Sequence, residues 1–279
     1  MLQTTVILPI YNESALAEQV LTRVLEHAER HPDRHMVLVD DASSDDTAEI
    51  IESILAGHPH PRVEFIRHPT NRGKAEAVIT GIRRCRGRMV CFIDGDLAYD
   101  FDHVDLLCQA LEAADVAIGS RSLSRESQSN ISLNRRCFGE GFNLLVRIIL
   151  GVSHRDTQAG LKGFRLEAAL RLFGALRTRS FAFDAEILYL ARRLDMKVAE
   201  VPALVSENHS YQTSSIDLIK DPLAMLWAII KVRSTRSGRA IPRTNIQVDP
   251  DVTRSDELPE IETFPAVMPR NSAEEPVSS

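Results

Sequence analysis

Short aliphatic and β-branched runs alternate with longer amphipathic stretches along the first 120 residues. The runs have the length of strands, and the stretches between them place apolar residues at helical spacing. The predicted strands are Thr4–Pro9, His35–Asp40, Val63–Arg67, Met89–Asp94 and Val116–Gly119, and the predicted helices are about Glu13–Glu29, Asp46–Ala56, Lys74–Arg84 and Asp102–Ala113. This alternation predicts an α/β fold, with a mostly parallel sheet and helices on both faces.

The second half of the chain is more helical. Helices are predicted at Leu133–Leu150, Ala182–Leu194 and Ile216–Val232, and a strand at Lys197–Val205. From residue 241 onward the chain has six prolines, eight acidic and three basic residues, and few large apolar ones. We therefore expect one domain over residues 1–235, with halves at 1–120 and 121–235, and a disordered acidic, proline-rich tail over 240–279.

Composition narrows the class of protein. The net charge of −6 argues against a nucleic-acid partner, and 44% hydrophobic residues suffice for a sizeable core. The four cysteines form no CxxC pair, so buried free thiols are expected, as in a reducing compartment. Neither a signal peptide nor an apolar run of about 18 residues is recognisable. We therefore expect a cytoplasmic protein.

Acidic residues follow the predicted strands at the edge where open parallel sheets bind ligands. Asp94-Gly95-Asp96 follows an apolar strand, so both carboxylates are expected to reach one hard cation, Mg²⁺ or Mn²⁺, that bridges two phosphates. A turn or a helix cap is the alternative explanation of this pair. Asp40 and Asp41 end the second strand, where a carboxylate would accept hydrogen bonds from a nucleobase or ribose, unless the pair serves only the turn.

Cationic and polar residues nearby favour a phosphorylated ligand. Gly73 and Lys74 open a helix, whose N-terminus attracts anions. Three arginines have forked geometry suited to phosphate, and three further positions are candidates for contact with a sugar or phosphate. The arginines are Arg121, Arg135 and Arg136, and the other positions are the loop residues Asp156 and Gln158 and one of the helix pair Asp184 and Glu186. Individually, each is also explained as a surface charge or a cap.

Taken in order, these motifs resemble glycosyltransferase family 2, which has the Rossmann-like GT-A fold. The motifs are Pro9-Ile10-Tyr11-Asn12-Glu13, Val37-Leu38-Val39-Asp40-Asp41-Ala42-Ser43, Asn71-Arg72-Gly73-Lys74, Asp94-Gly95-Asp96, Gly119-Ser120-Arg121, Arg155-Asp156-Thr157-Gln158-Ala159-Gly160-Leu161-Lys162-Gly163-Phe164 and Phe181-Ala182-Phe183-Asp184-Ala185-Glu186. The resemblance covers about residues 4–235 and is greatest to the dolichyl- or polyprenyl-phosphate sugar synthases. Within them, the Asp156 and Phe183 stretches look more like glucosyltransferases than mannosyltransferases.

The resemblance implies a role for each matching residue. Pro9, Tyr11, Glu13 and Asp41 would line the nucleotide pocket, with Asp40 beside them. Asp94 and Asp96 would hold the sugar diphosphate and its metal, and Arg121 with Arg135 or Arg136 would hold phosphates, including that of the acceptor. The stretch 206–215 departs from the family because it lacks the Gly-Ser-Lys-like motif of many relatives.

The implied reaction is an inverting displacement that moves a hexose from UDP-glucose or GDP-mannose to a polyprenyl phosphate. A phosphate monoester with a second pKa of about 6 is largely dianionic at neutral pH, so this acceptor needs no strong base. A hydroxyl acceptor would need one, for which Asp184 is the candidate. A family 2 enzyme with a soluble or polysaccharide acceptor is the alternative.

A lipid acceptor predicts contact with a membrane surface. Helices 134–150 and 216–232 combine apolar residues with arginine, lysine and Trp227, as expected for helices in a membrane interface, although such stripes also pack on a protein core. We therefore expect peripheral association, on the cytoplasmic face of a membrane. Since many relatives have C-terminal membrane spans, a separate membrane-anchoring partner is also considered.

Overall fold

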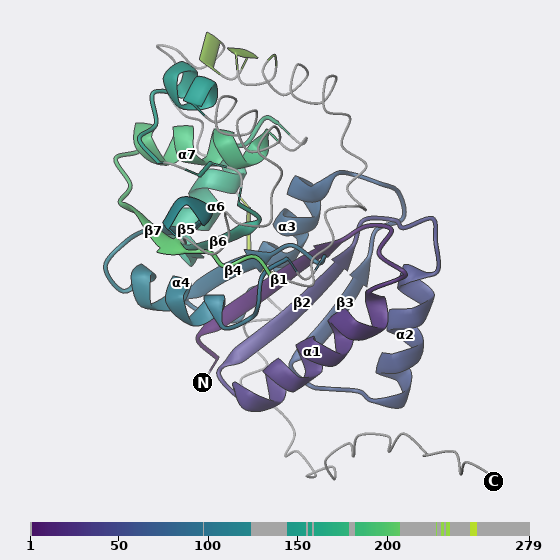
Figure 1. The fold of residues 1–279 in the computed structure, drawn as a ribbon. Coiled ribbons are helices and arrows are strands. Elements are labelled where there is room, and N and C mark those ends of the chain that lie inside the picture. The colour runs from purple at the N-terminus through teal and green to yellow at the C-terminus, as the bar shows by residue number, and fades with distance from the viewer. Residues whose placement is uncertain are drawn as a thin grey trace, which may run out of the picture.

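The structure is a computed structural model, and it describes residues 2–96, 98–123, 144–154, 156–157, 159–178, 182–206, 227, 230–231, 233–234 and 246–249. A seven-stranded sheet forms its centre, in the order β3-β2-β1-β4-β6-β5-β7 (Figure 1). The strands are β1 (Thr4–Ile10), β2 (Arg34–Asp40), β3 (Val63–Arg67), β4 (Met89–Ile93), β5 (Val116–Ser120), β6 (Leu161–Arg165) and β7 (Val198–Pro202). The predicted α/β fold with a mostly parallel sheet is confirmed, and only β6 runs antiparallel to its neighbours.

Helices cover both faces of this sheet. They are α1 (Ala17–Arg30), α2 (Thr47–Gly57), α3 (Lys74–Arg83), α4 (His103–Leu111), α6 (Leu166–Ala175) and α7 (Phe183–Arg193), with a short 3₁₀ turn η1 (Arg121–Leu123) after β5. One core packs α1, α2 and α4 on one face, and the other packs α3, α6 and α7 on the opposite face. Because both faces are covered, every residue of β1, β2, β4 and β5 is buried, which explains the apolar run at the centre of each.

Two elements differ from the sequence-based prediction. β6 and α6 are not among the predicted elements, because the sequence around Asp156 predicts a loop between helices. β6 inserts between β4 and β5, so these two strands, which follow each other in the sequence, are not neighbours in the sheet. Its sequence is Leu161-Lys162-Gly163-Phe164-Arg165. Two cationic residues and a glycine in five positions do not form the apolar or alternating pattern from which a strand is predicted.

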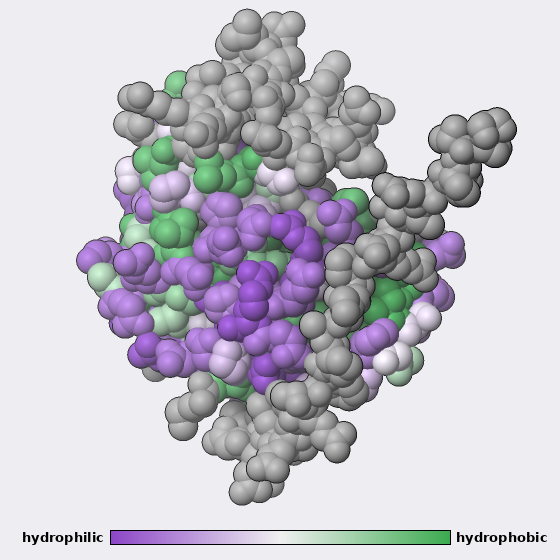
Figure 2. All heavy atoms as spheres, turned by 60° about the horizontal axis from the view of Figure 1, so that its bottom comes forward, coloured by the Kyte–Doolittle hydropathy of each residue, from purple (hydrophilic) through white to green (hydrophobic). Residues whose placement is uncertain are grey.

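The C-terminal half is described in part. Residues 144–150 are helical, in agreement with the predicted helix 134–150, and so are the described residues within 227–234. From the predicted tail, Ile246 packs against the core and the Asp249 carboxylate lies 2.9 Å from Arg84. Figure 2 turns the lower side of Figure 1 forward and shows hydrophilic residues over the centre of that face.

Candidate active site

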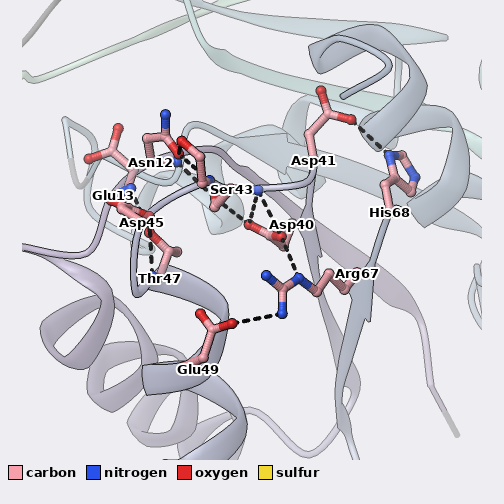
Figure 3. A network of polar contacts seen from close by, with 11 residues as sticks. Asn12, Glu13, Asp40, Asp41, Ser43, Asp45, Thr47, Glu49, Arg67 and His68 are labelled. Atoms are coloured by element: carbon pink, nitrogen blue, oxygen red, sulfur yellow. Dashed lines mark hydrogen bonds and ion pairs between the residues drawn. The ribbon is translucent and has the colours of Figure 1, made fainter. Parts of the chain in front are cut away.

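The loops after β1 and β2 interlock at the carboxyl edge of the sheet (Figure 3). The Asn12 backbone N–H donates to Ser43 Oγ at 2.8 Å, and the Ser44 N–H donates to Asn12 Oδ1 at 2.8 Å. Asn12 and Ala42 have φ values of 55° and 60°, in the left-handed region that residues other than glycine seldom adopt. The contacts between the loops thus hold a backbone path that neither loop would favour alone.

Asp40 lies at the base of this network and is fully buried. Its carboxylate accepts the Ser43 N–H at 3.1 Å and the Ser43 hydroxyl, and lies 3.6 Å from Arg67 Nε. Arg67 in turn pairs with Glu49 of α2 at 3.0 Å. The contacts of Asp40 are therefore with the protein, and they organise the turn, which is the alternative that the sequence left open.

Asp41 connects the end of β2 to the start of α3. Its carboxylate accepts the backbone N–H groups of Arg72 at 2.9 Å and Gly73 at 2.7 Å, and it contacts His68 Nδ1 at 2.8 Å. Gly73 has φ 87° and ψ 154°, a conformation that requires glycine. The predicted binding residues Asp41, Gly73 and Lys74 are thus brought to one corner of the site.

A hollow of about 500 Å³ opens beside these loops. It is lined by Ala42, Ser43, Ser44, Arg67, His68 and Pro69. The exposed ring of Tyr11 and the buried Pro9 belong to β1 and the loop after it, on the neighbouring strand. The carboxyl ends of β2 and β3 thus provide a recess beside the end of β1, at the edge where the nucleotide was predicted to bind.

Negative charge accumulates next to this recess. Burial and the carboxylates of Asp96, Asp45 and Asp94 raise the pKa of Glu13 to about 7. Because a cation would relieve this repulsion, the environment of Glu13 fits a divalent ion at Asp94 and Asp96. Within the described parts of the chain, no group of three or more His, Cys, Asp or Glu residues is arranged to hold a metal. Two carboxylates suit an ion that takes further ligands from substrate phosphates.

The two aspartates after β4 have different surroundings. Asp94 Oδ1 lies 2.5 Å from Lys74 Nζ, while Asp96 Oδ1 accepts the Ala98 N–H at 3.0 Å. Burial opposes the charge of Lys74, but the carboxylates of Asp94, Asp184 and Asp96 outweigh burial and raise its pKa. A Cβ on Gly160 would lie 1.9 Å from Asp94 Oδ2, so only glycine leaves room for this carboxylate.

Arg121 and Asp156 form a two-pronged ion pair. Arg121 Nε and Nη2 donate to the two carboxylate oxygens of Asp156 at 2.7 and 3.1 Å, and the Arg121 N–H adds a bond of 3.2 Å. Asp156 is buried, whereas the side chain of Arg121 is 38% exposed. Asp156 therefore orients the guanidinium of Arg121.

Asp184 and Glu186 point to different partners, as expected from their separation on the helix. Asp184 Oδ1 lies 2.7 Å from Lys162 Nζ, and both residues are buried. Glu186 accepts the backbone N–H groups of Arg177 at 3.2 Å and Thr178 at 2.8 Å, so its described contacts support the segment before α7. Arg135, Arg136 and Gln158, also predicted to bind substrate, lie outside the described residues.

Three partners of the predicted residues were not singled out from the sequence. They are Arg67, His68 and Lys162, which pair with Asp40, Asp41 and Asp184. For Lys162 a signal exists, because a lysine within a short apolar run that proves to be a buried strand needs a counter-ion. Arg67 and His68 give no such signal, since Arg67 ends β3, His68 follows it, and both look like surface residues in the sequence.

Solved structures share this α/β fold with its mostly parallel sheet. Glucosyl-3-phosphoglycerate synthase from Mycobacterium tuberculosis, in complex with Mn²⁺, UDP and glucosyl-3-phosphoglycerate, matches with a TM-score of 0.59 and 22% identity, over 85% of this chain and 81% of that one. Mannosyltransferase PcManGT from Pyrobaculum calidifontis, with GDP-Man and Mn²⁺, matches with a TM-score of 0.56 and 19% identity, over 86% and 66%. These likenesses show the GT-A fold.

Sequence comparison identifies the family. The profile described as "Glycosyl transferase family 2" matches residues 5–173. Dolichyl-phosphate beta-glucosyltransferase of Dictyostelium discoideum is 31% identical over 242 residues, covering 82% of this chain and 73% of the relative. The Saccharomyces cerevisiae enzyme of that name is 32% identical over 248 residues, covering 82% and 73%. The chain belongs to glycosyltransferase family 2 and is a glycosyltransferase, as its motifs predicted.

Proposed function

We propose that this glycosyltransferase moves glucose from UDP-glucose to a polyprenyl or dolichyl phosphate, with inversion at the anomeric carbon. The observation that carries the proposal is the acidic edge formed by Asp94, Asp96 and Glu13 beside the recess after β2 and β3. The glucosyl donor and the lipid acceptor are supported by the names of relatives that are 31–32% identical, including the human enzyme at 32% over 213 residues.

The nucleotide would lie against the loops after β1 and β2. Asn12 and Ser43 fix these loops, and Asp41 fixes the start of α3, so the recess is formed before any ligand arrives. Gly73 leaves the backbone accessible at the N-terminus of α3, where anions are stabilised. The diphosphate would extend from the recess toward Asp94 and Asp96.

Two carboxylates and substrate oxygens would hold a divalent ion, and such an ion supplies charge neutralisation to the departing diphosphate. The protein's own groups have complementary tasks. Lys74, close to Asp94, adds positive charge on the same side. Arg121, oriented by Asp156, offers a second cation for a phosphate group. Since the acceptor phosphate is itself the nucleophile, holding two anions close together is the main task of the site.

A lipid acceptor requires access from a membrane surface, which the helical residues after η1 would provide. Leu144, Leu145 and Ile148 are exposed on the helical residues 144–150, and Trp227 is 71% exposed. Arg233 donates to the carbonyl of Ile149, which brings the two segments together. The described helices include none with the length and hydropathy of a membrane span. Apolar side chains beside lysine and arginine suit peripheral contact with lipid.

The proposal is tested by transfer of label into lipid. Purified protein is incubated with Mn²⁺ or Mg²⁺, polyprenyl phosphate and one radiolabelled donor at a time, UDP-glucose or GDP-mannose, and extracted with organic solvent. We expect label in the organic phase with UDP-glucose, and its loss with EDTA. Transfer from GDP-mannose alone would correct the donor. Label that stays in water with every donor would refute the lipid acceptor and favour a soluble or polysaccharide acceptor.

A further inference from the structure

Lys162 lies in the interior of the sheet, where a charged side chain is seldom found. It is fully buried on β6 and is paired in register with Phe92 of β4 and Ile118 of β5. Its Nζ lies 2.7 Å from Asp184 Oδ1, 2.5 Å from the carbonyl oxygen of Ala159 and 5.7 Å from the centroid of the Phe92 ring. A buried ammonium is tolerated only with such partners, so its position is tightly fixed.

Asp184, the partner of Lys162, belongs to the same polar cluster as Asp94 and Asp96, the carboxylates proposed to hold the metal. Asp184 lies in the first turn of α7, and its charge acts on Lys74, which lies 2.5 Å from Asp94. Lys74 and Lys162 both lie near the Phe92 ring, at 5.7 Å from its centroid. Two lysine–aspartate pairs therefore flank one aromatic ring directly beneath the carboxyl edge of β4.

The carbonyl contact of Lys162 fixes a second part of the site. Ala159 precedes Gly160, whose Cα lies against the Asp94 carboxylate and whose carbonyl accepts the Asp94 N–H at 2.9 Å. Asp156, in the same segment, holds Arg121. The segment that Lys162 anchors thus supports one carboxylate for the metal and one cation for a phosphate.

We propose that Lys162 is a positioning residue for sugar transfer, which holds the Asp184 carboxylate toward the sugar of the donor. The proposal rests on the proposed function, and it adds that the donor sugar lies between the edge of β4 and α7. Lys162 touches no substrate and acts through Asp184. The ammonium group of Lys162 fixes the orientation of the Asp184 carboxylate, which a neutral side chain of equal length would not do.

A double-mutant cycle separates positioning from stability. Lys162→Met, Asp184→Asn and the double variant are assayed for kcat with UDP-glucose and polyprenyl phosphate. We expect Lys162→Met to lower kcat by about 100-fold, the cost of a donor sugar misplaced by about 1 Å. If Lys162 acts through Asp184, the double variant should match Asp184→Asn to within about twofold. A further multiplicative loss would overturn the proposal.

Arg34→Met is the matched control for loss of a buried cation. Arg34 is 4% exposed, contacts His27 at 2.6 Å and pairs with Asp105, but it begins β2 at the opposite edge of the sheet. We expect a lower Tm with kcat unchanged. If Lys162→Met behaves in the same way, Lys162 has only a structural role. If Lys162→Met does not fold, the comparison of Asp184→Asn with the double variant still tests whether Lys162 acts through Asp184. The double variant leaves no unpaired buried charge, because it removes both members of the ion pair.

A binding measurement keeps this test independent of the acceptor. Calorimetry with Mn²⁺ compares the affinity for UDP-glucose with that for UDP in each variant. In the wild type, the ratio of the two affinities measures what the glucose adds to binding. We expect Lys162→Met and Asp184→Asn to lower this ratio by the same factor, with affinity for UDP unchanged to within about twofold. An unchanged ratio in Lys162→Met would overturn the proposal. Inactivity of the wild type toward lipid phosphate would refute only the proposed function.

Discussion

Replacement of Glu13 by glutamine should stabilise the protein in neutral and alkaline solution without metal. Burial and the neighbouring carboxylates of Asp96, Asp45 and Asp94 raise the pKa of Glu13 from 4.5 to about 7. The folded state therefore binds this proton more tightly than the unfolded state. Binding of this proton therefore stabilises the folded protein. This contribution is fully present below pH 4.5 and is lost as the pH rises through 7. Glutamine carries no titratable proton, so the variant escapes this loss.

The size of the effect follows from the shift in pKa. Each pKa unit corresponds to about 1.4 kcal/mol, so the shift of Glu13 corresponds to at most about 3.5 kcal/mol for the wild type. Because Glu13 is only partly buried, screening by solvent reduces this to about 1–2 kcal/mol. For a domain of this size, the difference corresponds to a Tm higher by about 2–8 °C in Glu13→Gln above pH 7.

Thermal unfolding in EDTA between pH 5 and pH 8 measures this difference. Glu26→Gln, which removes an exposed carboxylate from α1, is the control, and a surface change of that kind is expected to stay within about 0.5 kcal/mol. The reasoning is refuted if the difference in Tm between Glu13→Gln and the wild type is the same at both ends of the range. It is also refuted if the variant is the less stable protein at pH 8.

Three further substitutions test other parts of the site. Asp96→Asn should lower transfer by about 100-fold or more and weaken Mn²⁺ binding measured by electron paramagnetic resonance; unaltered Mn²⁺ binding would speak against the metal site. Gly160→Ala, which puts a Cβ 1.9 Å from the Asp94 carboxylate, should destabilise by about 1–3 kcal/mol in denaturant unfolding, whereas Gly57→Ala, with nothing within 4 Å, should not; equal effects would contradict the packing argument. Arg121→Lys keeps the charge but loses the forked pairing, so kcat should fall while Tm changes little; an unchanged kcat would exclude a role in phosphate binding.

The fold of residues 1–120 was predictable because it alternates strands with amphipathic helices, and four of its strands, β1, β2, β4 and β5, are buried on both faces. The expected strand Thr4–Pro9 is found as Thr4–Ile10, and Val63–Arg67 is found unchanged. β6 could not be predicted in the same way. Its place between β4 and β5, antiparallel to both, is set by contacts between distant segments, and Lys162 is stable within it only because α7 supplies Asp184.

The candidate site was predictable as a set of residues at one edge, but not in its pairings. The position of Asp94 after a buried strand followed from the sequence, whereas its contact with Lys74 depends on how α3 packs against the sheet. The role of Asp41 likewise depends on the meeting of the segment after β3 with the end of β2. Such contacts between loops leave no periodic pattern in a single sequence.

The product of one reaction tests the central account most directly. Polyprenyl phosphate, UDP-glucose and Mn²⁺ are incubated with the protein, and the lipid product is examined by mass spectrometry and by the proton coupling at its anomeric carbon. The account predicts the mass of the lipid phosphate plus one hexose, joined in the β configuration that inversion of UDP-glucose gives, and no product from Asp96→Asn. An α-linked product, or glucose found only on a water-soluble acceptor, would contradict it.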